Sequence, residues 1–205
     1  DVKKYMDESL DTTQYHYDEK NRLIEKITKD EDGEVDMHEK FTWDEKALLK
    51  HVITGVEENI ISLDEFVYDQ KGNVLEHHQI NEETGENQKT VSAYDEAGHK
   101  ISEEIYNEDD ELVETTSFEH DETGRVVSAS YQSPGKTSTT GYSYDASGNL
   151  LVQEETDENG NQLLWAEHEY DGDNNRTGTT VFVNGGTPYN SQHYELTYEY
   201  EWFED

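Results

Sequence analysis

The chain has 205 residues, of which 31% are hydrophobic, and its formal net charge is −35 at pH 7. A surface this negative repels nucleic acid phosphates and anionic lipid headgroups, which argues against both as partners. No apolar run reaches the ~18 residues that a membrane-spanning helix needs, so we expect no membrane insertion by this segment. The absence of cysteine excludes disulfides and thiolate chemistry.

Residues 1–14 precede the first regular feature of the sequence, and we expect an N-terminal cap or linker there. The chain begins at Asp1 rather than at a methionine, which indicates a processed or trimmed product. A signal peptide or a lipid-anchor cysteine would then have been removed with the sequence upstream.

Over residues 15–197 an aromatic residue followed by Asp recurs about every 25 residues, a period typical of repeat arrays. We call each pair a mark. The chain predicts seven hairpin repeats over this range, and a C-terminal capping strand or tail over 198–205. The marks are Tyr17-Asp18, Trp43-Asp44, Tyr68-Asp69, Tyr94-Asp95, His120-Asp121 (His in the aromatic position), Tyr144-Asp145 and Tyr170-Asp171.

Each mark is followed by a turn signal. An Asp that opens a turn can accept hydrogen bonds from the backbone just after it, and Gly or Asn three residues later can adopt the left-handed conformation that closes the turn. Asn21 and Asn174 take the Gly position in the first and last repeats, whereas Ala47 breaks the rule and predicts a turn of different construction. The predicted structural turn residues are Asp18, Asp69, Asp95, Asp121, Asp145, Asp171, Gly72, Gly98, Gly124 and Gly148.

A second turn signal falls about halfway through most repeats, as in "DEDG" at 30–33 and "DENG" at 157–160. The second repeat has only the irregular "TGVEEN" at 54–59. Each repeat is therefore two strands and two turns. The predicted fold is all-β, with tandem hairpins in one antiparallel sheet that curls or spirals, because open sheets rarely exceed ~10 strands without curling or splitting.

The motifs "YDASGNL" and "YDQKGNV", with "DENGNQ" between marks, resemble the YD repeat of Rhs-type surface proteins. The resemblance covers the chain from Tyr15 to about Tyr198. It implies a long antiparallel sheet of successive hairpins, which in large members becomes a hollow shell around a toxin domain. It also implies a cell-surface location and carbohydrate or ligand binding. This chain has seven repeats rather than dozens, and it shows neither the core region that ends the repeats nor a toxin domain.

The acidic residues do not indicate a catalytic pair. A glycosidase needs one carboxyl group with a raised pKa in an apolar pocket, whereas most acids here fall in turns or at polar strand positions. The histidines form no zinc signature, because neighbours such as His77 and His78 point to opposite faces of a strand. We expect no cofactor and no metal. Weak calcium binding at "DEDGEVD" (30–36) is left open, since oxygen ligands gather there.

Aromatic side chains are the remaining functional signal, since Tyr and Trp can stack on sugars or anchor a protein partner. Most belong to the repeating positions and suit a small core. Trp165 falls outside that pattern and is the candidate ligand contact. The leading hypothesis is a secreted or cell-surface binding or adhesion module, lipid-anchored through its removed N-terminus, with a carbohydrate or protein ligand. The alternatives are a structural spacer or shell fragment of a larger Rhs-like assembly, and a glycoside hydrolase.

Overall fold

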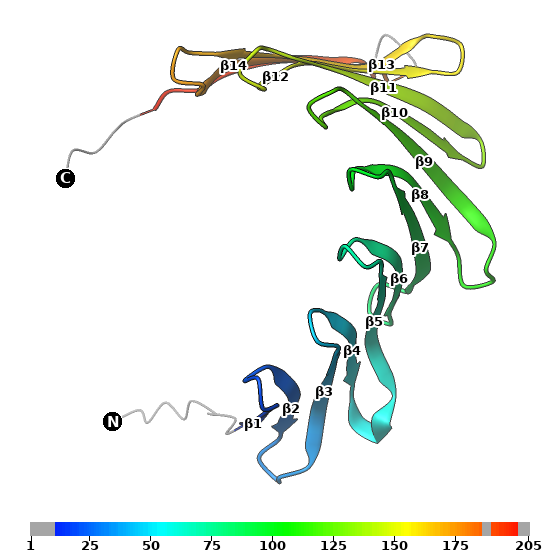
Figure 1. Ribbon diagram of the computed structural model, residues 1–205, viewed down its shortest axis with the longest axis vertical. Coiled ribbons are helices and arrows are strands. Elements are labelled where there is room, and N and C mark those ends of the chain that lie inside the picture. The colour runs from blue at the N-terminus through cyan, green and yellow to red at the C-terminus, as the bar shows by residue number, and fades with distance from the viewer. Residues whose placement is uncertain (1–10, 186–189, 201–205) are drawn as a thin grey trace, which may run out of the picture. The chain divides into compact units, whose positions relative to one another are not determined.

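The computed structural model of the chain describes residues 11–185 and 190–200 (Figure 1). Within these residues there are 15 β-strands and one short 3-10 helix, η1 (Val56–Glu58). The strands form a single sheet, and their order across the sheet is their order along the chain. Successive strands pair antiparallel within each part of the sheet. These observations confirm the predicted all-β array of tandem hairpins.

The chain divides into two compact units. Unit 1 contains Asp1–Ser92 and Ile105–Leu112, and unit 2 contains Ala93–Glu104 and Val113–Asp205. The first seven strands are β1 (Thr12–Tyr17), β2 (Leu23–Lys29), β3 (Val35–Trp43), β4 (Leu48–Thr54), β5 (Ile60–Tyr68), β6 (Val74–Asn81) and β7 (Glu86–Tyr94). The other eight are β8 (Lys100–Tyr106), β9 (Leu112–His120), β10 (Val126–Ser133), β11 (Lys136–Tyr144), β12 (Leu150–Asp157), β13 (Gln162–Tyr170), β14 (Arg176–Val183) and β15 (Gln192–Thr197).

Every mark lies at the end of an odd-numbered strand, so the turn after it leads into the following even-numbered strand. The pairing register shifts by one residue beside the mark, for example between His16 and Tyr17 and between Ser143 and Tyr144. Such a β-bulge leaves a backbone group without its ladder partner and increases the local twist. A backbone group beside the bulge is therefore available for a hydrogen bond from outside the strand ladder.

The turns at the opposite ends of the strands also follow the sequence signals. Gly33, Gly85, Gly135 and Gly160 have positive φ angles, from 70° to 83°. The irregular "TGVEEN" segment forms η1, in which Glu57 has a positive φ of 64°. These halfway turns are therefore where the sequence predicts them, while the last one, at 184–186, lies partly outside the described residues.

The sheet has almost no conventional core. Among the described residues, only Leu63 and Ala166 are buried apolar side chains, at 6% and 7% exposure, and no large side chain is fully buried. The other buried residues are the polar Ser92, Ser138 and Thr179. Since burial of apolar area is normally the main source of stability, this sheet depends unusually strongly on cross-strand contacts and turn hydrogen bonds.

The ends of the chain are only partly described. β1 begins at Thr12, inside the segment 1–14 expected to be a cap or linker. Residues 198–200 follow β15 without strand structure, while residues 1–10 and 201–205 lie outside the described residues. The assignment of these segments as caps stays a prediction.

Candidate interaction surface at the Tyr-Asp turns

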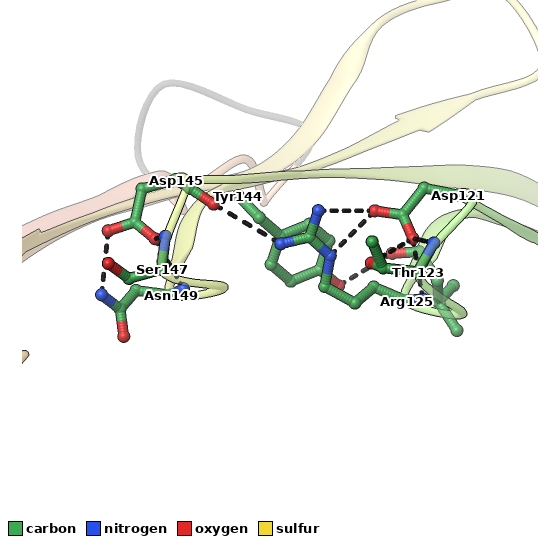
Figure 2. A network of polar contacts seen from close by, with 8 residues as sticks. Asp121, Thr123, Arg125, Tyr144, Asp145, Ser147 and Asn149 are labelled. Carbon is green, nitrogen blue, oxygen red and sulfur yellow. Dashed lines mark hydrogen bonds and ion pairs between the residues drawn. The ribbon is translucent and has the colours of Figure 1, made fainter.

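We name the turn after each mark a Tyr-Asp turn and number these turns from first to seventh. The sixth turn shows how the motif works (Figure 2). The Asp145 N–H donates to the Asn149 carbonyl at 3.0 Å, and the Gly148 N–H donates to the Asp145 carbonyl at 3.1 Å. Oδ1 of Asp145 accepts from the N–H groups of Ser147 and Asn149, at 2.9 and 2.8 Å. One carboxylate therefore satisfies two donors that the tight turn leaves free.

The other turn residues singled out by the sequence lie in equivalent positions. The carboxylates of Asp18, Asp69, Asp95, Asp121 and Asp171 each accept a hydrogen bond from the backbone N–H four residues later, at 2.9–3.0 Å. The glycines have positive φ angles of 94° at Gly72, 94° at Gly98, 83° at Gly124 and 91° at Gly148. Asn21 and Asn174 have φ angles of 60° and 64°.

The second turn is shorter than the others. The Asp44 N–H donates to the carbonyl of Ala47 at 3.1 Å. This acceptor is three residues after the Asp, whereas in the other turns it is four residues after it. Oδ1 of Asp44 accepts from the N–H groups of Lys46 and Ala47, both at 2.6 Å. Ala47 is not among the residues with positive φ. The different construction predicted from Ala47 is present.

A further residue completes the long turns, and the sequence analysis did not single it out. We call it the linking residue, and it stands four positions after the Asp. Its side chain donates to the second carboxylate oxygen, as with Arg22 at 2.7 Å and Asn149 at 2.8 Å. The available signal was that this position is polar in all six long turns. The linking residues are Arg22, Asn73, His99, Arg125, Asn149 and Asn175.

The aromatic residue of the mark connects one hairpin to the one before it. The Trp43 Nε1–H donates to the Leu23 carbonyl at 2.8 Å, and the Tyr68 hydroxyl donates to the Leu48 carbonyl at 2.9 Å. Each acceptor is the first residue of the even-numbered strand in the preceding hairpin, next to its bulge. We name this hydrogen bond the aromatic latch. In unit 2 it recurs from Tyr144 to Val126 and from Tyr170 to Leu150, at 2.8 and 3.0 Å. Tyr200, which follows β15 and belongs to no mark, makes the equivalent bond to the Arg176 carbonyl at 2.9 Å.

Together these observations explain the repeating pattern: Asp and Gly build the turn, and the aromatic residue supplies the hydrogen bond that the neighbouring bulge lacks. A scan of protein-family models gives a match over residues 40–195 to the family described as Teneurin YD-shell. The chain belongs to the Teneurin YD-shell family. The matched residues include the second to seventh Tyr-Asp turns of this YD-shell chain.

Solved structures with similar folds include two of TcdB2-TccC3. The complex with Cdc42 is 12% identical with a TM-score of 0.44, and the form without the hypervariable C-terminal region is 12% identical with a TM-score of 0.47. Each comparison covers 92% of the YD-shell chain but only 13% of the other chain. A porin-like protein from Bacteroides uniformis is 9% identical, with a TM-score of 0.49, and the match covers 90% of this chain and 88% of that one. No curated protein matches the chain.

Hydrogen bonds within each turn lower the pKa values of the turn carboxylates. The amide of Asn149 and its backbone N–H lower the pKa of Asp145 below its ordinary value. The Thr123 hydroxyl, with the backbone and side chain of Arg125, lowers the pKa of Asp121. These bonds favour the charged form, so the Asp side chains act as ionised turn anchors rather than as proton donors.

Calcium ligation was left open at residues 30–36. Oδ1 of Asp30 accepts the N–H groups of Asp32 and Glu34, at 3.0 and 2.9 Å, as in the Tyr-Asp turns. In the described part of the YD-shell chain, no three His, Asp or Glu side chains gather as a metal site. Nor does the same part contain a helix long and apolar enough to cross a membrane.

Unit 1 also carries hydrogen bonds between His and acidic side chains of adjacent strands. Glu25 of β2 lies between His16 of β1 and His38 of β3, at 2.5 and 2.8 Å. Both histidines lower the pKa of Glu25. The pair His77 and Asp64 joins β6 to β5 at 2.8 Å. Cross-strand pairs of this kind stabilise a sheet locally, and here they replace part of the missing core.

Trp165 lies in the middle of β13, where it is half-buried. It stands directly opposite Glu154 of β12 and Phe182 of β14. Glu154 also lines a shallow hollow of about 330 Å³ over Gly141, whose other walls include Thr139, Ser143 and Val152. Trp165 is therefore one strand away from this hollow.

Proposed function

We propose that the chain is a structural wall segment of a larger YD-shell assembly, with protein partners and no catalytic role. The observation that carries this proposal is the aromatic latch, by which Trp43, Tyr68, Tyr144 and Tyr170 each join their hairpin to the preceding one, so that the same hydrogen bond occurs in both units. Repeats joined only to their neighbours stack into extended walls. Family membership supports the same function, and we propose that the sheet curls as shell walls do.

The two end strands support continuation of the wall. Every residue of β1 and β15 is exposed, and each strand stands at one end of the strand order. An end strand presents unpaired backbone groups that readily accept another strand. We propose that further YD-type strands, from the same polypeptide or from a partner, cover these edges.

The proposed location is extracellular or at the cell surface, with a lipid anchor upstream of Asp1. The family supports an extracellular setting. The net charge of −35 favours basic protein partners over nucleic acid, since electrostatic complementarity steers association.

Chemical cross-linking in the native cells, followed by mass spectrometry, tests the wall proposal. We expect cross-links to YD-type sequence outside residues 1–205 from Lys20, which follows β1, and, with a carboxyl-reactive reagent, from Glu195 of β15. We also expect the native protein to sediment as a particle larger than the 23.7 kDa of residues 1–205. A native chain that sediments at the mass of a single chain, with no such cross-links, would contradict the proposal.

A second candidate is carbohydrate binding at Trp165 and the hollow over Gly141. An indole ring beside hydroxyl and carboxylate groups is suited to stacking and hydrogen bonding with a sugar. A glycan array with the intact chain should then show binding that Gly141→Val, which fills the hollow, and Trp165→Leu both abolish. Binding that survives both substitutions in folded protein would place the sugar elsewhere.

A further inference from the structure

The second Tyr-Asp turn lacks one residue. Three residues separate Asp44 from the start of β4 at Leu48, whereas four separate Asp69 from the start of β6 at Val74. In the long turns the fourth of these positions holds the linking residue. The second turn therefore has no linking residue between Ala47 and Leu48.

Arginine linking residues show what this position does elsewhere. The Arg22 guanidinium lies 5.4 Å from the centre of the Trp43 ring and donates to the Asp44 carbonyl at 2.5 Å. The Arg125 guanidinium lies 4.8 Å from the centre of the Tyr144 ring and donates to the Asp145 carbonyl at 3.4 Å (Figure 2). In both cases a planar cation covers the next aromatic residue and caps the next Asp carbonyl.

Between the second and third turns the corresponding space forms a hollow. Its volume is about 330 Å³, and its walls come from Asp44–Ala47 and from Tyr68–Gly72. Tyr68 is the aromatic residue that an arginine would cover, and it is half-buried and held by its latch to Leu48. The hollow therefore has a fixed aromatic wall where the chain itself supplies no guanidinium.

The electrostatics of the hollow also differ from those of a filled position. Burial raises the pKa of Tyr68, and the nearby Asp44 carboxylate raises it further. Burial also raises the pKa of Tyr144, but there the charge of Arg125 acts in the opposite direction. The hollow is also lined by Lys46 and Lys71, but the three carboxylates of Asp44, Glu45 and Asp69 outnumber these two ammonium groups. The lining therefore keeps a net negative charge, which favours an added cation beside Tyr68.

We propose that this hollow binds the guanidinium group of an arginine from a basic partner protein. The group would lie on the Tyr68 ring and donate to the Asp69 carbonyl. That carbonyl accepts the Gly72 N–H at 3.2 Å and has a second lone pair for a further donor, as the Asp145 carbonyl does when it accepts both Gly148 and Arg125. The net charge of −35 attracts such a partner. The site goes beyond the wall proposal and would exist in the isolated chain.

The probe for this site is N-acetyl-arginine amide, titrated into the intact chain and followed by backbone amide NMR. We expect saturable millimolar shifts centred on Ala47, Leu48 and Gly72. N-acetyl-citrulline amide, which keeps the shape but lacks the charge, should produce at least tenfold weaker binding. The lysine analogue should also bind more weakly, because an ammonium cannot lie flat on the ring and donate from a fork.

A filled-site variant provides the decisive control. Ala47→Gly combined with an arginine inserted before Leu48 restores the long turn, and it should abolish binding of the probe. Ala47→Gly alone should retain binding. If the insertion variant does not fold, Ala47→Leu narrows the hollow without changing the turn length and should weaken binding several-fold. Absence of saturable shifts, equal binding of the citrulline analogue, or undiminished binding to a folded filled-site variant would overturn the proposal.

Discussion

The fifth Tyr-Asp turn is one residue longer than the second, and the two turns have very different surroundings. In the fifth turn, Asp121 accepts hydrogen bonds from Thr123 and Arg125, and Arg125 continues to the next turn (Figure 2). In the second turn, the Asp44 carboxylate accepts the backbone N–H groups of Lys46 and Ala47, and no linking residue donates to it. The Asp carboxylate closes the turn in both, whereas the space toward the next turn is crossed by Arg125 in the fifth turn and is a hollow in the second.

The largest effect is expected at Gly124 of the fifth turn. Its φ is 83°, and a Cβ atom there would lie 2.4 Å from Nε2 of His99, which stacks on His120. Gly124→Val should lower the free energy of unfolding by roughly 3 kcal/mol or more, since strain and overpacking combine. Thermal and urea melts measure this loss. Ala47→Val in the second turn is the matched control and should cost much less, because Ala47 does not have a positive φ.

Gly148 of the sixth turn separates strain from crowding. Its φ is 91°, and the only close contact of an added Cβ atom is Nη1 of Arg125 at 3.7 Å. Gly148→Val should cost roughly 1–3 kcal/mol from backbone strain. Gly148→Asn should cost less, because Asn21 and Asn174 already adopt this conformation. Equal melting temperatures for the Val and Asn variants would show that the left-handed conformation is not required.

The aromatic latch can be removed without removing its ring. Tyr144→Phe leaves the Val126 carbonyl beside the bulge without its donor and should cost roughly 0.5–1.5 kcal/mol, the net value of a hydrogen bond. Denaturant melts of the two proteins give the difference. Tyr142→Phe on the same strand is the control, since the Tyr142 hydroxyl makes no latch to any residue that the structure describes. A cost equal to that of Tyr142→Phe would exclude a stabilising role for the latch.

The smallest effect is expected in the pH dependence of stability. The pKa of Asp121 and that of Asp44 are both lowered by folding, so each contributes stability that is present above pH ~4 and is lost as the pH falls through the folded pKa. Asp121→Asn should therefore destabilise at pH 6, and this loss should shrink steadily as the pH falls from about 4 toward 2. Asp44→Asn should show the same trend with a smaller loss at pH 6, because it has fewer partners. The measurement is the melting temperature of each variant across that range, and a pH-independent difference would contradict this account.

Local turn chemistry explains why so much could be predicted from the sequence. A type of turn that needs Asp at its start and a left-handed residue near its end restricts both positions to a few amino acids. The seven marks, the halfway turns and the exception at Ala47 were therefore readable without coordinates. The regular spacing of the marks then determined the succession of antiparallel hairpins.

Only the tertiary structure decided which groups meet between repeats. The latch from Tyr144 to Val126 depends on a carbonyl that becomes available because of the bulge in the strand register. The half-burial of Trp165 depends on strands placed on both sides of β13. The hollow beside Tyr68 exists because a missing residue in one turn leaves a space that only the neighbouring turn can define. Turns are local and can be read from a few residues, whereas contacts between hairpins depend on register, and register is set by the whole array of pairings.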